Sequence, residues 1–169
     1  RGGRREEGGV VFRRGGGVGG SEPGVGRRRE CDAVVWCIGA RTERRLTAPG
    51  SELPGVVTAM DYLTSVTKAL LDGTDSLVSA KGKNVIVLGG GDTGTDCVAT
   101  AILQEASSVR QLEIMPQLPL QRADDNPWPL SPRICKTDYG QQEAQAVDGE
   151  DPRAYEITGK EVLGSAHGV

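Results

Sequence analysis

The sequence predicts an α/β fold built on a parallel sheet, and two features of the chain carry that prediction. Short apolar runs typical of buried parallel strands occupy residues 32–40 and 84–88. Stretches with apolar residues at helical spacing follow these runs, bounded by residues that favour helix termini. Strands that alternate with helices indicate βαβ units, whose strands lie parallel in one sheet.

Composition limits the size of the core. The 169 residues are enough for one domain, but only 4% are aromatic and 25 are glycine, so we do not expect a core along the whole chain. The formal charge of −3 is divided unevenly. Residues 1–30 hold eight Arg against four Glu, whereas the remainder is acidic.

Residues 1–30 are a low-complexity segment rich in glycine and arginine. With eleven glycines and Phe12 as its single aromatic, the segment cannot bury enough apolar surface to offset its ordering entropy, so we expect disorder. The alternative is an arm that binds RNA through phosphate contacts, but such arms usually interleave aromatics. Nucleic acid is therefore not the expected partner. A membrane is not expected either, because no stretch approaches the roughly 20 apolar residues that a membrane helix needs.

The cysteines predict neither a metal site nor a nucleophile. Cys31, Cys37, Cys97 and Cys135 form no C-x-x-C pair, and the lone histidine is His167. Reduced thiols in an intracellular protein, in cytoplasm or plastid, are the favoured interpretation. We expect no catalytic side chain, so any chemistry must come from a cofactor.

The body of the chain begins with the strand expected at 32–40, followed by a connection that contains two Pro-Gly pairs. A helix is expected next, from an N-cap at Thr58 to a stop at Gly73. Its apolar residues recur at helical spacing and would face the core: Met60, Leu63, Val66, Leu70 and Leu71.

The strand at 84–88 leads into a helix expected at 92–104 and a second strand at 108–115. Four prolines then forbid regular structure over a long loop. Trp128, between two of them, would either stack on a ligand or pack over the core, and core packing is favoured. A short helix is expected at 140–147, and a terminal strand or hairpin fragment at 154–165.

The glycines after the first of these strands predict a dinucleotide site. Strand, Gly89-x-Gly91-x-x-Gly94, helix and strand form the order of a Rossmann-like βαβ unit. Gly89 would permit the tight turn, Gly91 would let a pyrophosphate approach the backbone, and Gly94 would let the helix pack close to the strand. The phosphates would bind the free amides at the helix N-terminus. A purely structural glycine turn is the alternative.

The cofactor-binding residues expected in this loop are Gly89, Gly90, Gly91, Asp92, Thr93 and Gly94. A carboxylate beside a pyrophosphate is repelled, so Asp92 is expected to point away and cap the helix through Thr95. Reaching toward the nicotinamide is its other role. Asp96 favours the helix dipole and needs no further function.

Glu113 is the expected selector of the nucleotide. It lies 19 residues beyond Gly94, where an acid accepts hydrogen bonds from the ribose 2′-hydroxyl. An NADPH site would need arginines to meet the 2′-phosphate, and Arg110 and Arg122 lie on either side. We therefore expect NADH, with NADPH through Arg122 as the alternative.

These segments resemble the pyridine-nucleotide:flavin oxidoreductase portion of glutamate synthase, of the NADH-dependent type. That portion is the small subunit in bacteria and the C-terminal region of fused enzymes elsewhere. The resemblance covers residues 31–164 in order, and it rests on DAVVWCIGA, GGGDTGTDC, QLEIMP and DNPWP. The last two argue against the flavin-reducing domain of another multidomain reductase, such as dihydropyrimidine dehydrogenase.

The resemblance implies a fold with two dinucleotide-binding domains, in which an NAD(P)H domain is inserted into an FAD domain. Residues 31–56 would be a fragment of the FAD domain, with Ile38, Gly39 and Ala40 near the flavin. Residues 57–169 would be the NAD(P)H domain, truncated at its C-terminus. The family's FAD fingerprint, iron–sulfur cysteines and final FAD segment are absent, so the chain is expected to be an incomplete fragment.

The expected function is the electron-input module of glutamate synthase, which passes hydride from NADH to FAD. In the family, iron–sulfur clusters and FMN that this chain would not bind then support glutamate formation from glutamine and 2-oxoglutarate. The expected partner is the large subunit or the remainder of the same polypeptide, and the isolated fragment would be inactive. The alternative is a non-catalytic nucleotide-binding remnant or an RNA-binding arm on an inactive domain.

Overall fold

The computed structural model describes residues 32–33, 35, 42–165 and 168–169. The chain divides into two units, Arg1–Arg41 and Thr42–Val169, and every element described below belongs to the second. The segment 1–30, most of the strand expected at 32–40, and the flavin candidates Ile38, Gly39 and Ala40 lie outside the described residues.

Within the described residues, three parallel strands form one sheet, in the order β1-β2-β3. They are β1 (Asn84–Leu88), β2 (Ser108–Leu112) and β3 (Arg153–Ala154). The register places Leu88 of β1 opposite Leu112 of β2, so both strands end together at the carboxyl edge. The α/β class with a parallel sheet is confirmed.

Strand β2 is shorter than the 108–115 expected from the sequence. The backbone N–H of Met115 donates to the side-chain Oε1 of Glu113, 3.0 Å away, rather than to a neighbouring strand. Such a local side-chain bond turns the backbone out of a ladder. Pro116 follows and has no N–H to continue pairing.

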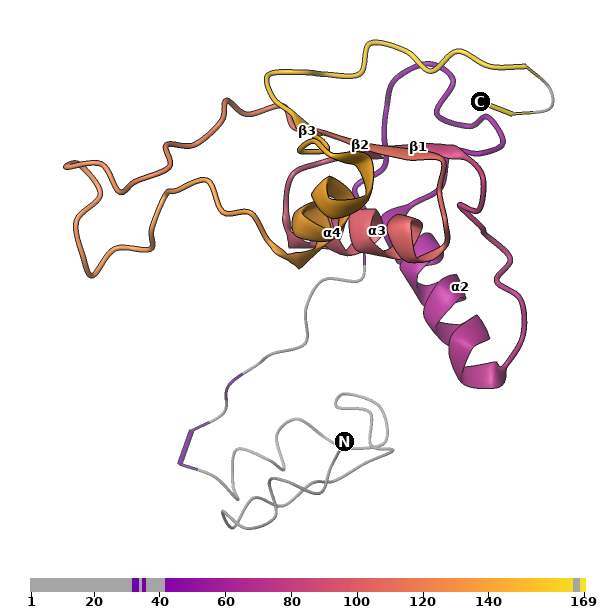
Figure 1. Ribbon diagram of the computed structural model, residues 1–169, viewed down its shortest axis with the longest axis horizontal. Coiled ribbons are helices and arrows are strands. Elements are labelled where there is room, and N and C mark those ends of the chain that lie inside the picture. Colours follow the sequence, from indigo (N-terminus) through magenta and orange to yellow (C-terminus); the bar gives the residue numbers. More distant parts are fainter. Residues whose placement is uncertain (1–31, 34, 36–41, 166–167) are drawn as a thin grey trace. The chain divides into compact units, whose positions relative to one another are not determined.

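The helices of the described residues lie on one side of the sheet (Figure 1). They are α2 (Ala59–Asp72), α3 (Asp92–Leu103) and α4 (Tyr139–Asp148), close to the bounds expected from the sequence. The buried core between helices and sheet is small and made of modest side chains: Tyr62, Ala80, Val87, Cys97, Val98, Ala101, Val109 and Ala144.

Helix α2 has the expected ends but not the whole expected apolar face. Thr58 accepts from the N–H of Asp61, and Gly73 ends the helix with a φ of 66°. However, Met60, Leu70 and Leu71 are exposed. The face that packs consists of the following residues: Ala59, Tyr62, Leu63, Val66 and Ala69.

One aromatic residue explains why a different face of α2 packs against the core than the one expected. The Tyr62 hydroxyl donates to Gln104 Oε1 at the end of α3, 2.9 Å away. This bond lets the ring lie buried against α3 with its polar end satisfied. Leu70 and Leu71 then lie on the far side of α2.

Helices α3 and α4 pack backbone against backbone at Gly140. A Cβ on Gly140 would overlap the carbonyl oxygen of Thr95 and lie 3.3 Å from the Cβ of Ala99. Helix α4 begins with a capping box in which Asp138 and Gln141 satisfy each other's backbone amides. Because of the overlap with Thr95, the contact between α3 and α4 needs a residue without a side chain at position 140.

The Pro-rich loop between β2 and α4 is held together by its own hydrogen bonds. The buried Asn126 donates to the carbonyl of Ser131 and accepts from the N–H of Arg133. Arg122 donates to the carbonyls of Asn126 and Leu130. Trp128 is 83% exposed, so its expected packing over the core is wrong. The polar contacts shape the loop instead.

After β3 the chain returns to the start of the unit. The N–H of Val162 donates to the carbonyl of Pro49 at 2.8 Å, and the N–H of Val169 to that of Pro54 at 3.0 Å. Beyond Ala154 the described residues contain only an isolated antiparallel bridge, Ser165 to Gly168. The strand or hairpin expected at 154–165 is therefore wrong beyond Ala154, which ends β3. Glu156 and Ile157 still donate to the carbonyls of Met115 and Glu113, and Val162 then bonds to the Pro-Gly connection.

We predict that Gly140→Ala lowers the free energy of unfolding by about 2 kcal/mol, because the added methyl must push α4 away from α3. Alanine's helix preference of up to ~1 kcal/mol over glycine does not compensate. Urea denaturation measures the change. Gly159→Ala is the control, since a Cβ there meets nothing within 4 Å. Equal stabilities of the two variants would contradict the close contact.

Candidate functional site

The glycine loop joins the carboxyl end of β1 to the N-terminus of α3. Gly89 has a φ of 122°, which only glycine adopts readily, so the expected tight turn is confirmed. Its N–H donates to the carbonyl of Leu112, and its carbonyl accepts from Gln111 Nε2 at 2.9 Å. Gly91 is the N-cap of α3. Gly89, Gly90 and Gly91 are all exposed.

The other glycines of the loop differ in what an added side chain would meet. A Cβ on Gly94 would overlap the carbonyl oxygen of Gly89 and lie 2.8 Å from Gln111 Nε2, so the expected close packing of α3 is confirmed. A Cβ on Gly90 would overlap the carboxylate of Glu113. A Cβ on Gly91 would meet nothing within 4 Å, so the space above that residue is open.

Asp92 does not play the expected capping role. It is the first residue of α3, and the N-cap, Gly91, has no side chain to accept a hydrogen bond. The Thr95 hydroxyl accepts from Gln141 instead, at 2.8 Å. Asp92 and Thr93 are exposed at the open end of the helix. The first amides of α3 are thus left without a side-chain cap, as an anion site requires.

Asp96 has a partner that the sequence did not indicate. It accepts a hydrogen bond from the Tyr139 hydroxyl at the start of α4. This bond raises the pKa of Tyr139 to about 12, chiefly because ionised tyrosine could not donate to the carboxylate. Asp96 therefore joins α3 to α4 besides lying in the first turns of α3.

Glu113 lies beside the glycine loop, where the sequence predicted an acid. Because Leu88 and Leu112 are in register, Gly89 and Glu113 both leave the sheet at the same edge. One carboxylate oxygen of the half-buried Glu113 accepts from the N–H of Met115, and the other lies over Gly90. The structure therefore brings Glu113 and Gly90 together.

Both arginines considered for a 2′-phosphate have other partners. Arg110 forms an ion pair with Glu150. Arg122 bonds to two carbonyls inside the Pro-rich loop, at 2.9 and 3.0 Å. Either guanidinium would have to give up these contacts to meet a phosphate.

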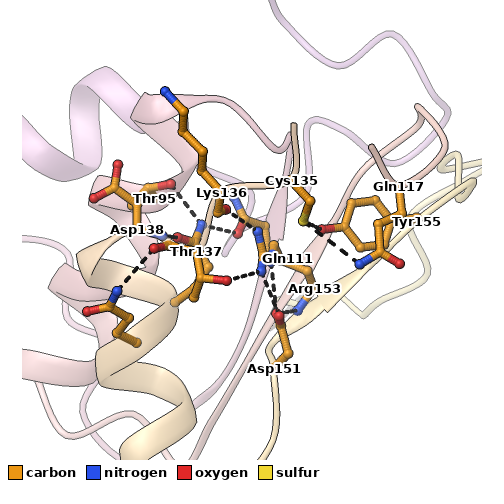
Figure 2. A network of polar contacts seen from close by, with 12 residues as sticks. Thr95, Gln111, Gln117, Cys135, Lys136, Thr137, Asp138, Asp151, Arg153 and Tyr155 are labelled. Atoms are coloured by element: carbon orange, nitrogen blue, oxygen red, sulfur yellow. Dashed lines mark hydrogen bonds and ion pairs between the residues drawn. The ribbon is translucent and has the colours of Figure 1, made fainter. Parts of the chain in front are cut away.

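A buried polar network beneath the glycine loop was missed by the sequence analysis. Gln111 is 0% exposed and Gln141 3%, and the Nε2 of Gln141 donates to both Thr95 Oγ1 and Gln111 Oε1. Figure 2 shows Gln111 and Thr95 within this network. One sequence signal existed: Gln111 falls on the same face of β2 as the buried Val109. A glutamine at a core position needs buried partners.

A second network fixes the end of the Pro-rich loop. The Arg153 guanidinium, on β3, bonds to Asp151, to the carbonyl of Lys136 and to the hydroxyl of Thr137 (Figure 2). Its hydrogen bonds hold the pKa of Asp151 below the ordinary value, against the opposing effect of burial. The loop therefore returns to α4 at a position set by β3.

The described cysteines differ in environment. Burial raises the pKa of the Cys97 thiol to about 11, with a smaller effect from the charge of Asp96. Cys135 is half-buried and lies 3.5 Å from the Tyr155 hydroxyl. Among the described residues, no group of three His, Cys, Asp or Glu side chains is placed to hold a metal ion. None of the helices there is long and apolar enough to span a membrane.

The sequence is also similar to those of known proteins. The sequence model of the pyridine nucleotide-disulphide oxidoreductase family matches residues 8–127, more than half of the chain. The match begins inside the segment 1–30, and the expected domain bounds remain predictions.

Similar proteins are glutamate synthases. The glutamate synthase [NADPH] small chain of Bacillus subtilis is 45% identical over 144 residues, which span 83% of this chain and 29% of that protein. The glutamate synthase [NADH] of Saccharomyces cerevisiae is 45% identical over 139 residues, 81% of this chain and 6% of that protein. That of Schizosaccharomyces pombe is 48% identical over 132 residues, 76% and 6% respectively. The chain thus spans less than a third of each of these three relatives.

We predict that Cys97 reacts with iodoacetamide at pH 8 on the order of a hundredfold more slowly in the native chain than in urea. With a pKa of about 11, only about one thiol in a thousand is ionised at that pH. Peptide mass spectrometry over time measures the rate at each cysteine. Equal rates at Cys97 in native and unfolded protein would contradict its burial.

Proposed function

Since the chain belongs to the pyridine nucleotide-disulphide oxidoreductase family, we propose that its β1–α3–β2 unit binds the pyrophosphate and adenosine ribose of NAD(P)H. The observation that carries the proposal is the open, exposed backbone at Gly91, directly at the uncapped N-terminus of α3. Free amides at a helix N-terminus favour an anion. A side chain at Gly91 would fill the space in which a phosphate approaches the backbone.

In the proposed complex the residues of this chain bind and orient the cofactor. The amides of the glycine loop and of the first turn of α3 hold the pyrophosphate. Glu113 accepts from the ribose hydroxyl, with Gly90 leaving room for its carboxylate. When bound, the nicotinamide would supply a hydride for a flavin, so the side chains here would bind and orient the cofactor without acting as an acid or base.

We further propose that the chain is the electron-input part of a glutamate synthase, which uses FAD and forms glutamate from glutamine and 2-oxoglutarate. The names of its relatives support this assignment. The partner would be the large subunit or the remainder of the same polypeptide. Ile38, Gly39 and Ala40 would approach the flavin.

NADH is the proposed nucleotide, although the relatives' names include both NADH and NADPH. The support is local: the Glu113 carboxylate lies beside Gly90, where we propose that the ribose binds, and both nearby arginines are engaged elsewhere. A 2′-phosphate at Glu113 would meet a like charge instead of a guanidinium.

We predict that Gly91→Val weakens NADH binding to the 169-residue chain at least tenfold, about 1.4 kcal/mol, because the branched side chain fills the phosphate space. The fold should tolerate the change, since the Cβ meets no other atom within 4 Å. Calorimetry measures affinity and thermal unfolding measures stability. Gly159→Val, at another open glycine, is the control. Equal NADH affinity in wild type and Gly91→Val would return the glycines to a structural role.

For nucleotide choice, we predict that the intact enzyme prefers NADH to NADPH by roughly tenfold or more and that Glu113→Gln removes most of this preference. Gly90→Ala should weaken it as well, because the methyl displaces the Glu113 carboxylate. The measurement is the rate of flavin reduction by each nucleotide, with Glu161→Gln as the control. A ratio that stays constant in Glu113→Gln would point to Arg122 as the selector.

A further inference from the structure

We propose that Gln111 and Gln141 are positioning residues that hold the peptide between Gly89 and Gly90 with its N–H facing the bound phosphate. The inference rests on the proposed nucleotide site and assigns a role to two side chains outside it. Neither glutamine contacts the open side of the loop, since both are almost fully buried. They act through the backbone of Gly89.

The two side chains form a directional chain of hydrogen bonds. The backbone N–H of Asp138 donates to Gln141 Oε1 at 3.1 Å, and Gln141 Nε2 donates to Gln111 Oε1 at 2.9 Å. Gln111 Nε2 then donates to the carbonyl oxygen of Gly89, also at 2.9 Å. A backbone N–H can only donate and a carbonyl can only accept. The two ends therefore fix which way each amide points, without ambiguity between its oxygen and nitrogen.

The orientation of the Gly89 carbonyl decides where the next amide points. The described chain has one cis peptide bond, between Trp128 and Pro129, so the bond between Gly89 and Gly90 is trans. In a planar trans peptide the N–H points opposite to the C=O. Because the Gly89 carbonyl points at the buried Gln111, the N–H of Gly90 points toward the exposed side of the loop. Within the described residues this N–H has no acceptor.

Without Gln111 this orientation would be weakly held. Glycine lies on both sides of the peptide, so the peptide can rotate with little steric cost. Rotation would turn the carbonyl oxygen toward the phosphate and the N–H into the interior, which reverses the local dipole. The buried Gln111 amide offers the carbonyl a partner on one side only.

The same chain ties the loop to α3 and α4. Gln141 Nε2 also donates to Thr95 Oγ1, one residue after Gly94, where α3 lies against the Gly89 carbonyl. The relay therefore joins the start of α4, the interior of β2 and both ends of the glycine loop. All polar atoms of the relay have hydrogen-bond partners, so the network holds the two side-chain amides in one orientation.

The test uses the 169-residue chain with two ligands, NADH and inorganic pyrophosphate. Gln111→Met keeps the length of the side chain and removes the donor. Gln141→Met leaves Gln111 free to turn its amide over. Gln104→Met is the matched control, because Gln104 is also a partly buried amide, but it accepts from Tyr62 and Ala80, outside the relay.

We expect Gln111→Met to raise the NADH dissociation constant at least tenfold and to abolish the shift of the Gly90 ¹H–¹⁵N resonance on adding pyrophosphate. Gln141→Met should raise the constant about threefold and reduce that shift, since the Gln111 amide becomes free to turn. Gln104→Met should lower the thermal midpoint while leaving affinity and the Gly90 shift as in wild type. The Gly90 resonance distinguishes a positioning role from a stabilising one. Replacing a glutamine that only stabilises the fold would leave the response of Gly90 to pyrophosphate unchanged.

The inference is overturned if folded Gln111→Met keeps both the wild-type affinity and the Gly90 shift. Should that variant fail to fold, Gln141→Met decides, and an unchanged Gly90 response there overturns the inference. If wild type responds to pyrophosphate at Gly90 but binds no NADH, the positioning role stands and the nucleotide proposal fails. If wild type binds NADH while the Gly90 amide does not respond, the nucleotide proposal stands and the positioning role fails. Binding of neither ligand rejects both.

Discussion

The attachment of Gly89 to strand β2 is the constraint on which the rest of the site depends. Its N–H bonds to the carbonyl of Leu112, and its carbonyl bonds to the side chain of Gln111. These two bonds fix Gly89 at the point where β1 ends and the loop begins. Helix α3 then packs so close to the Gly89 carbonyl that Gly94 must lack a side chain. The open helix N-terminus at Gly91 follows from this arrangement.

The sequence predicted the strand–loop–helix unit because its signals are local. The spacing of glycines, the position of Glu113 and the caps of α2 each depend on residues within one turn or one βαβ unit. The placement of Glu113 beside Gly90 follows from the register of two parallel strands, which a single sequence pattern also implies. These features needed no knowledge of distant packing.

The features that the sequence did not predict depend on partners far along the chain. Gln111 finds Gln141 thirty residues away, and Tyr62 finds Gln104 forty-two residues away. Leu70 looks as suitable for the core as Val66, and only the position of α3 distinguishes them. Apolar content likewise overstated the burial of β1, because the described helices cover one face of the sheet and Ile86 is 65% exposed on the other.

The Glu113 carboxylate joins the end of β2 to the glycine loop. One oxygen of its carboxylate takes the N–H of Met115, which ends β2 and starts the Pro-rich loop. The other lies over Gly90, where any Cβ would overlap it. The same side chain thus ends a strand, occupies the space left by a glycine and places a carboxylate beside the glycine loop, where we propose that the ribose binds. An arginine at this position would reverse the charge but could not accept from the Met115 amide. If Glu113 selects the nucleotide as we propose, this selection and the path of the loop depend on the same carboxylate.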